Sequence, residues 1–424
     1  MKNVLMICYY YPPISDVGSL RSVIFSKYLS FFGWSPTVLS VSNPYRQYCR
    51  IGNTKSPDEV PVVRARCIFN LFAPLNLLNG ICSRFYRILN LPVSSIMLHQ
   101  VLSLCVPDFF LPWIPDAVLK GIRLKRLPYD AIYASCSPLS AAVVGAILKR
   151  LTGKPLILDY RDVMNNRIRL GSKAFWPLLH DAVERYLLRV CDHLILAQRN
   201  TLEIYLRTYP FLRGKISLIY NGYSDEFLPH SKRSIRDGNG RFTIGYSGWF
   251  YHGLSPSAPF FKALRKLLSD GFIPGDKITF RYIGPRDEML YASIRSYGLE
   301  HIFEDLGYSS QKCVRKVVEN ADVILLRNFG FGITTKLFEG LSLGKTFLAL
   351  HKGGEFEELL LRYSPHSIVV HPNSESDISH AIIELYRRWE KGELCDVVSE
   401  AFQAEFNPYE RTRRLACLLS KVTA

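Results

Sequence analysis

Short apolar runs alternate with amphipathic stretches along the whole chain. In its first part, six runs are rich in apolar residues and bounded by turn residues, which is typical of buried strands. They cover residues 3–8, 36–42, 129–135, 154–162, 192–198 and 215–223. Residues 19–33 place Leu20, Ile24, Tyr28 and Phe31 at helical spacing, with Gly33 as a stop, and residues 137–153 predict a second helix.

The same alternation returns after a polar stretch at residues 229–241. Apolar runs predict strands at residues 242–249, 277–285, 321–328 and 345–351. Helical spacing occurs between and after them, at residues 258–271, 334–344 and 406–424. Strands that alternate with helices, and that are apolar throughout, are typical of parallel sheets covered on both faces.

The pattern predicts an α/β protein with two doubly wound, Rossmann-like domains that face each other across a cleft. We expect residues 1–205 to form the first domain and residues 242–405 the second. Residues 206–241 are the predicted linker region, and the helix at 406–424 is expected to cross back to the first domain. Ligands of such sheets bind beyond the carboxyl ends of the strands.

Charge separates the two halves of the chain. The net charge is +16, from 53 Lys and Arg against 37 Asp and Glu. Residues 1–200 hold 24 basic and 11 acidic residues, or +13, which leaves +3 for the rest. A basic first half suits phosphate-bearing partners or an anionic membrane surface, although solubility alone is the other interpretation. Nucleic acid is not expected, because no recognition motif accompanies the charge.

Ten cysteines are scattered without a C-x-x-C pair or a Cys/His cluster, so no metal site is expected. Cys8 and Cys191 lie in or beside predicted strands and are interpreted as buried thiols of a reducing, cytoplasmic protein. The N-terminus lacks the features of a signal peptide, and no apolar run is long enough for a transmembrane helix. Residues 68–115 interleave apolar and basic residues, which suits either a membrane surface or a buried helical pair.

The helix predicted at 334–344 begins with a cation, although a helix start already carries partial positive charge. Lys336 and Glu339 lie three residues apart, away from the apolar stripe of Leu337, Phe338 and Leu341. A salt bridge in this order is weak, and Glu339 is not three residues after Thr334 or Thr335, as a capping box requires. A phosphate held by Thr335, Lys336 and free N–H groups, with Glu339 accepting from a ribose diol, explains both residues.

Two glycines after predicted strands permit close approach of a ligand to the backbone. Gly248 ends the strand at 242–249 and is interpreted as a phosphate-binding turn or as a simple tight turn. Gly18 opens the first helix, and Arg21 in its first turn is a candidate for holding an anion, or else an ordinary surface arginine.

Four charged residues follow predicted strands of the first domain and are candidates for contact with a ligand. The predicted strand at 154–162 ends in Asp159, Arg161 and Asp162. These residues suit contact with ligand hydroxyl groups, and a structural Asp–Arg pair is equally compatible with them. Asp162 and Asp16 are the candidate catalytic acceptors of a proton.

Several motifs in order resemble the GT-B glycosyltransferases of family 4. The segment TTKLFEGLSLGK at 334–345 is similar to the donor-binding segment of that family. The segments around Gly18 and Arg21, around DYRD, at IYNGYSDEF and at IGYSGWFYHG look like its other signatures, and 409–422 occupies the place of its terminal helix. The resemblance implies a GT-B fold that needs no metal or cofactor, with Glu339 on the ribose and the start of the helix on the diphosphate of a nucleotide sugar.

The sequence also departs from the family in three places. Phe331 stands where relatives often carry a glutamate that contacts the donor sugar. After the glycine turn, His252 stands where relatives often have a basic residue, so Lys336 and Arg327 are expected to hold the diphosphate. The RDPW of close relatives is RDVM in this chain.

The resemblance implies a retaining glycosyltransferase of bacterial surface-polysaccharide synthesis, peripheral on the cytoplasmic face of the membrane. Its co-substrates would be a nucleoside-diphosphate sugar and a saccharide acceptor, expected to be lipid-linked. Two alternatives remain: a nucleotide-sugar epimerase, and a catalytically silent subunit, which Phe331 and the missing basic residue would suit. The sugar, the base, the linkage and the oligomeric state are not encoded in these motifs.

Overall fold

The computed structural model describes residues 1–14, 17–45, 49, 51–52, 56–70, 105–124, 128–164, 175–228, 240–250, 258–327 and 332–424. They form two compact units. Unit 1 comprises Met1–Tyr220 with Arg411–Ala424, and unit 2 comprises Asn221–Glu410.

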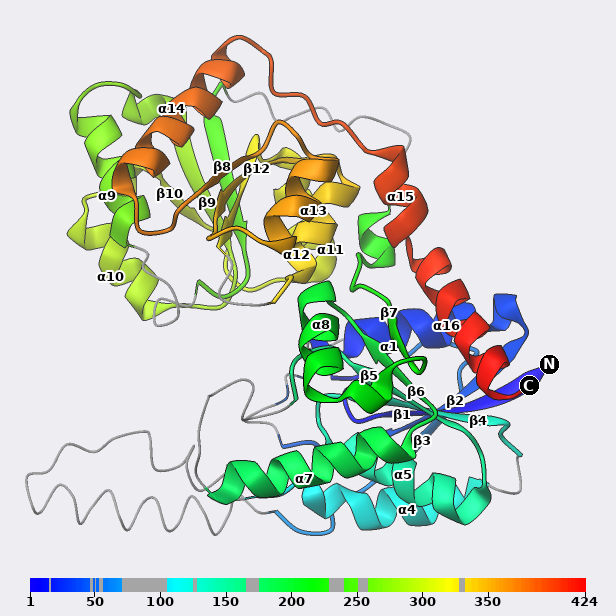
Figure 1. Cartoon of the computed structure of the whole chain (residues 1–424). Helices are drawn as coiled ribbons and strands as arrows, with labels where there is room; N and C mark the ends of the chain where they lie inside the picture. Colours follow the sequence, from blue (N-terminus) through cyan, green and yellow to red (C-terminus); the bar gives the residue numbers. More distant parts are fainter. Residues whose placement is uncertain are drawn as a thin grey trace, which may run out of the picture. The chain divides into compact units, whose positions relative to one another are not determined.

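Unit 1 is built on a seven-stranded parallel sheet with the order β3-β2-β1-β4-β5-β6-β7. Figure 1 labels these strands. Its strands carry unbroken apolar runs because helices cover both of their faces. The strands are β1 (Lys2–Cys8), β2 (Trp34–Val41), β3 (Val62–Ala65), β4 (Ala131–Cys136), β5 (Leu156–Tyr160), β6 (His193–Leu196) and β7 (Ile216–Leu218).

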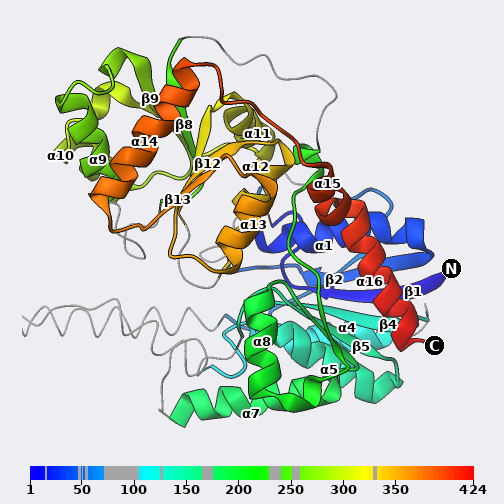
Figure 2. The ribbon, with the colours of Figure 1, turned by 45° about the horizontal axis from the view of Figure 1, so that its top comes forward.

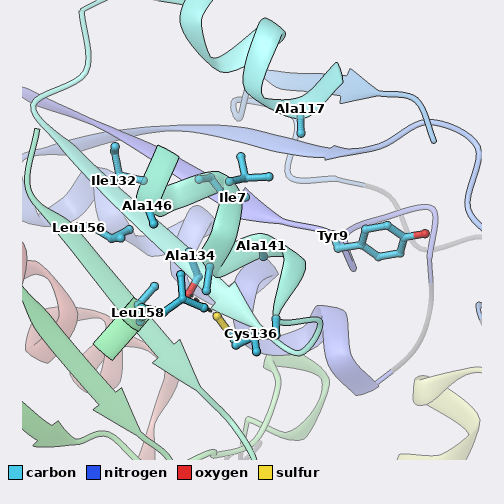
Figure 3. Packing of buried hydrophobic residues seen from close by; sticks show 14 of the residues in the cluster. Ile7, Tyr9, Ala117, Ile132, Ala134, Cys136, Ala141, Ala146, Leu156 and Leu158 are labelled. Atoms are coloured by element: carbon cyan, nitrogen blue, oxygen red, sulfur yellow. Dashed lines mark hydrogen bonds between the residues drawn. The ribbon is translucent and has the colours of Figure 1, made fainter. Parts of the chain in front are cut away.

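Two core clusters show which helices cover each face of this sheet. One face packs against α4 (Ile114–Arg123), α5 (Ser140–Thr152), α7 (Phe175–Val190) and α8 (Arg199–Thr208). Figure 3 shows part of this core, where Ile7, Ala134 and Leu158 of three neighbouring strands lie near Ala141 and Ala146 of α5. The opposite face packs against α1 (Val17–Tyr28) and α16 (Pro408–Val422) (Figure 2).

Unit 2 is built on a six-stranded parallel sheet with the order β10-β9-β8-β11-β12-β13. Its strands are β8 (Phe242–Ser247), β9 (Ile278–Ile283), β10 (Phe303–Asp305), β11 (Val323–Arg327), β12 (Thr346–Leu350) and β13 (Ile368–Val370). Its α-helices are α9 (Ala258–Ser269), α10 (Glu288–Ser296), α11 (Gln311–Asn320), α12 (Thr335–Ser342), α13 (Glu355–Tyr363), α14 (Glu375–Glu390) and α15 (Glu400–Phe406). Helices α9, α10 and α14 share one core with the strands.

The predicted fold class is confirmed, since both sheets are parallel and doubly wound. Gly33 ends the first helical segment with a φ of 80°, and Cys8 and Cys191 are buried, as expected. The first boundary differs from the prediction of a linker that starts at residue 206. Strand β7 pairs with β6, so the chain remains in unit 1 up to Tyr220.

Among the described helices, none combines the length and the apolar character that crossing a bilayer requires. The apolar and basic stretch at 68–115 lies mostly outside the described residues.

Candidate functional site

The order of strands in unit 2 reverses at β8. Strands β9 and β10 lie on one side of β8, and β11, β12 and β13 lie on the other. A doubly wound sheet has its ligand crevice at this point, beyond the carboxyl ends of the strands. Gly248 directly follows β8, Arg327 is the last residue of β11, and α12, the next described element, begins at Thr335. Three of the predicted donor-site features are therefore positioned by the same edge of one sheet.

Helix α12 starts without a side-chain cap, as expected from the spacing of its residues. Thr334 is the N-cap residue, and its side chain accepts no capping hydrogen bond. The predicted apolar stripe is buried, with Leu337, Phe338 and Leu341 all inside the unit. The packing of this stripe directs Lys336 and Glu339 to the other side of the helix.

The Lys336 ammonium lies against the end of β8. It donates to the Tyr246 hydroxyl over 3.3 Å and lies 4.3 Å from the centre of that ring. Gly248 has a φ of 83°, and a Cβ on it would be 3.2 Å from both Cε and Nζ of Lys336. A side chain at residue 248 would therefore be strained in the backbone and would crowd the ammonium. The structure brings Gly248 and Lys336 together, as the motif interpretation requires.

Glu339 is 5% exposed, and in the described part of the chain its carboxyl group takes part in no hydrogen bond or ion pair. Burial raises the pKa of Glu339 to about 7, and nearby Glu226 acts in the same direction. Burial lowers the pKa of Lys336 to about 8. Each shift is opposed by the attraction between Lys336 and Glu339, although no ion pair of the described residues joins them. The alternative of a salt bridge between Lys336 and Glu339 therefore has no support in the described residues.

Arg327 is engaged by the glycine turn itself. Its guanidinium is buried, lies 4.0 Å from the centre of the Phe250 ring and donates to the Phe250 carbonyl. Burial lowers its pKa to about 10. The Tyr246 hydroxyl donates to the Trp249 carbonyl over 2.7 Å. Arg327 and Tyr246 therefore hold the turn that contains Gly248, a positioning role that the motif interpretation did not include for Arg327.

A second glycine supports this turn and was missed by sequence reasoning. A Cβ on Gly284, which follows β9, would lie 2.5 Å from the Gly248 carbonyl oxygen. The Gly248 amide donates to the Ile283 carbonyl over 2.7 Å. The available signal was the Gly-Pro pair that ends the predicted strand at 277–285.

The candidate site residues of unit 1 form a different kind of cluster. Arg21 Nε donates to Asp159 Oδ2 over 2.7 Å, and Nη2 donates to Oδ1 over 3.1 Å. Both side chains are buried, at 3% and 0% exposure. Arg21 Nη1 donates to the Tyr220 carbonyl over 2.8 Å, and the Tyr133 hydroxyl donates to Asp159. The interpretation of Arg21 as a surface residue is wrong, and Asp159 pairs with Arg21 instead of with Arg161.

Arg161 connects the ends of β4 and β5 to the start of α1. It donates to the carbonyl groups of Gly18 and Ser137, the latter over 2.8 Å. A Cβ on Gly18 would lie 3.0 Å from Arg161 Nη1, so the glycine allows this approach. Asp162 is exposed beside it. The remaining candidates, Asp16 and His252, and the departure at Phe331 lie outside the described residues.

No three His, Cys, Asp or Glu side chains of the described ranges are arranged to hold a metal ion.

The chain matches no family model and no curated protein. Solved structures do match it over nearly its whole length. Sucrose-phosphate synthase from Thermosynechococcus elongatus has a TM-score of 0.67 at 14% identity, with 99% of each chain covered. HepE from Anabaena, in complex with UDP, has a TM-score of 0.62 at 15% identity, with 99% of this chain and 100% of that chain covered. WaaG, a glycosyltransferase involved in lipopolysaccharide biosynthesis, has a TM-score of 0.57 at 12% identity, covering 99% and 98%.

At these identities the likeness concerns the fold. The chain has the two Rossmann-like domains of the GT-B architecture, which confirms the fold expected from the sequence resemblance.

Proposed function

We propose that the protein is a glycosyltransferase that uses a nucleoside-diphosphate sugar as donor. The observation that carries this proposal is the convergence of Gly248, Lys336 and Glu339 at the switch point of the unit 2 sheet. The GT-B fold and the motif resemblance of α12 add to it. HepE, which has this fold, was solved in complex with UDP.

The diphosphate of the donor would lie at the start of α12. The free N–H groups of the first helical turn and the Lys336 ammonium offer it hydrogen bonds and positive charge. Gly248 leaves the space next to Lys336 open. A bound diphosphate would favour the charged form of Lys336 and so offset the cost of burying that cation.

The ribose would be held by Glu339. A buried carboxylate without hydrogen-bond donors is costly, and two vicinal hydroxyl groups would satisfy it. One turn of helix separates this carboxylate from Lys336, so one nucleotide can meet both groups. We therefore assign Lys336 to the diphosphate and Glu339 to the ribose.

The rate of sugar transfer would depend on how well the protein stabilises the charge of the leaving diphosphate. As the bond between the sugar and the diphosphate breaks, negative charge grows on the diphosphate oxygens. The helix start and Lys336 would stabilise that charge. We propose that the sugar is transferred with retention and without a metal, as the family resemblance implies.

The proposed acceptor is a saccharide, lipid-linked, in the synthesis of a bacterial surface polysaccharide. The excess of basic residues in the first half of the chain supports an acceptor that carries phosphate and a location on the cytoplasmic face of the membrane. Asp162 is an exposed carboxylate that follows β5, where it suits contact with acceptor hydroxyls.

A thermal-shift panel of nucleoside diphosphates and their sugars tests the donor assignment, because ligands of the native state raise its melting temperature. We expect one nucleotide series to stabilise the protein. We expect Lys336→Ala and Glu339→Ala to weaken that binding about ten-fold or more in calorimetry. Unchanged binding in both variants would refute the site. Incubation with the donor alone separates the alternatives, since an epimerase would produce a new sugar isomer without an acceptor.

A further inference from the structure

Unit 1 contains a cavity that the proposed donor site does not use. It lies beyond the carboxyl ends of β2 and β3 and has a volume of about 590 Å³. Small-molecule sites of proteins have about 300–1,000 Å³. The lining residues on which the argument rests are Asn43, Tyr45, Arg66, Cys67, Ile68 and Phe69.

Hydrogen bonds hold the walls of this cavity in place. The Asn43 side chain accepts from the Cys67 amide over 2.8 Å and donates to the Cys67 carbonyl over 3.1 Å. The Tyr45 hydroxyl donates to the Phe69 carbonyl over 3.0 Å. The Ile68 amide donates to the Pro112 carbonyl over 3.0 Å. A cavity with such walls requires little ordering when a ligand binds.

Two large apolar side chains are exposed at this cavity. Ile68 is 57% exposed and Phe69 is 50% exposed, although their backbone groups are tied to neighbouring segments. Leu111, next to Pro112, is exposed as well. Isolated apolar residues on a surface need no explanation, but adjacent ones at the mouth of a cavity suit an apolar ligand.

Among the described residues that line the cavity, Arg66 is the one cation. The Arg66 amide donates to Asp116 over 2.6 Å, while its exposed guanidinium has no hydrogen bond or ion pair within the described ranges. Lys120 Nζ lies 3.4 Å from the Asp116 carboxylate and offsets its charge. The guanidinium of Arg66 is therefore available to a ligand, and arginine binds phosphate oxygens in a bidentate manner.

We infer that this cavity binds a phosphorylated lipid, with the phosphate or pyrophosphate on Arg66 and the hydrocarbon chain against Ile68 and Phe69. Its identification with the lipid-linked acceptor rests on the proposed function. The same chemistry exists in the anionic phospholipids of a bilayer, so the experiment includes both sources.

The experiment measures binding of farnesyl phosphate to the full chain by calorimetry, with farnesol and inorganic phosphate as partial ligands. We expect both partial ligands to bind at least about ten-fold more weakly, because each lacks one of the two groups that the cavity recognises. A parallel arm measures flotation with phosphatidylcholine vesicles that contain or lack phosphatidylglycerol. The site is supported if either farnesyl phosphate binding or vesicle flotation depends on Arg66. The measurement that shows this dependence identifies the source of the lipid.

The variants are Arg66→Ala and Phe69→Ser, matched by Arg207→Ala and Leu151→Ser on other exposed parts of unit 1. Arg66→Ala should weaken farnesyl phosphate binding about ten-fold or more, in line with the strength of charge-assisted hydrogen bonds, and Phe69→Ser about five-fold. The control variants should bind like the unchanged protein. Equal binding by Arg66→Ala and its control in both arms would overturn the inference.

A nucleotide-binding measurement on the same variants separates this inference from the proposed function. Binding of the donor nucleotide should be unchanged in Arg66→Ala, since the predicted donor residues belong to unit 2. Loss of lipid binding with intact nucleotide binding is the expected result. If the protein binds farnesyl phosphate through Arg66 but binds no nucleotide, the lipid site is supported and the proposed glycosyltransferase function is refuted.

Discussion

Each unit has a buried cation and a buried carboxylate close together near the carboxyl edge of its sheet, and the two pairs differ in their hydrogen-bond partners. In unit 1, Arg21 and Asp159 are joined by two hydrogen bonds, and Tyr133 and the Tyr220 carbonyl complete their surroundings. In unit 2, Lys336 and Glu339 form no ion pair among the described residues, and burial shifts the pKa of each toward its neutral form.

The difference separates two uses of buried charge. A cation and an anion that satisfy each other hold a structure together and leave little for a ligand. Charged groups that are buried without such partners lower the stability of the ligand-free protein. A ligand that supplies the missing contacts binds more tightly as a result. This contrast favours unit 2 as the donor site and gives Arg21 a structural role, in place of the expected binding of an anion.

The largest effect is expected from breaking the satisfied pair. Arg21→Ala should destabilise the protein by about 3–5 kcal/mol, because it leaves Asp159 buried without its cation. Urea denaturation measures the change. The double variant Arg21→Met, Asp159→Leu should recover part of the loss, since it removes both charges. A cost below about 1 kcal/mol for Arg21→Ala would mean that the pair does not hold unit 1 together.

The next effect concerns the unsatisfied carboxyl group and has the opposite sign. Folding raises the pKa of Glu339 from 4.5 to about 7, so the folded state is penalised once the pH exceeds both values. Glu339→Gln should therefore raise the free energy of unfolding above pH 7 by about 3 kcal/mol, and should have no such effect below pH 4.5.

The same variant should bind the donor nucleotide about ten-fold more weakly, because an amide accepts fewer hydrogen bonds than a carboxylate. Urea denaturation at pH 8 and pH 4, together with calorimetry, checks both parts. A variant that is less stable at pH 8 would show that Glu339 is satisfied in the apo protein.

The glycine turn offers a matched pair of smaller effects. Gly248 and Gly33 have φ values of 83° and 80°, but only Gly248 has other atoms within 4 Å of the position of an added Cβ. Alanine at either position should cost about 1–2 kcal/mol through backbone strain. Donor binding should fall only in Gly248→Ala, where the methyl group crowds Lys336. Equal binding by the two variants in calorimetry would remove the turn from the site.

The smallest expected effect is the pH profile of donor binding. Affinity should be highest between about pH 7 and 8, because Glu339 gains a proton below this range and Lys336 loses one above it. The change should not exceed ten-fold per pH unit for each group. Calorimetry across pH 6–9 gives the profile, and Lys336→Met should remove its alkaline limb. A profile that is unaltered by this substitution would assign the limb to another group.

Local sequence patterns predicted ten of the thirteen described strands and the start of α12, but missed the short edge strands β3, β10 and β13. An unbroken apolar run such as 242–249 is typical of a strand in a sheet that is covered on both faces, and residues 242–247 form β8. Parallel strands end at the same edge of a sheet. The turn at Gly248 and Lys336 in the first turn of α12 are therefore expected to lie close together, although they are 88 residues apart in the sequence. The convergence follows from topology.

Pairings that depend on side-chain direction were not predictable in the same way. Arg21 and Asp159 are 138 residues apart, and nothing in either local pattern indicates that their side chains meet. Arg327 was expected near a diphosphate, but the position of the Phe250 ring decides where its guanidinium lies. The hydrogen bonds that form the lipid cavity join Asn43 and Tyr45 to Cys67 and Phe69, and such contacts have no periodic signature.

The path of the chain has a consequence for how this protein is made. The chain leaves unit 1 at Tyr220 and returns to it at Arg411, so unit 2 is inserted into unit 1. Leu415, Ala416 and Leu419 of α16 belong to the core that contains Met6, Tyr133 and Ile157. During synthesis, all seven strands of unit 1 leave the ribosome long before α16, which covers part of this face together with α1. A nascent chain that stops before residue 411 would thus carry a complete unit 2 and a first unit whose core is partly uncovered.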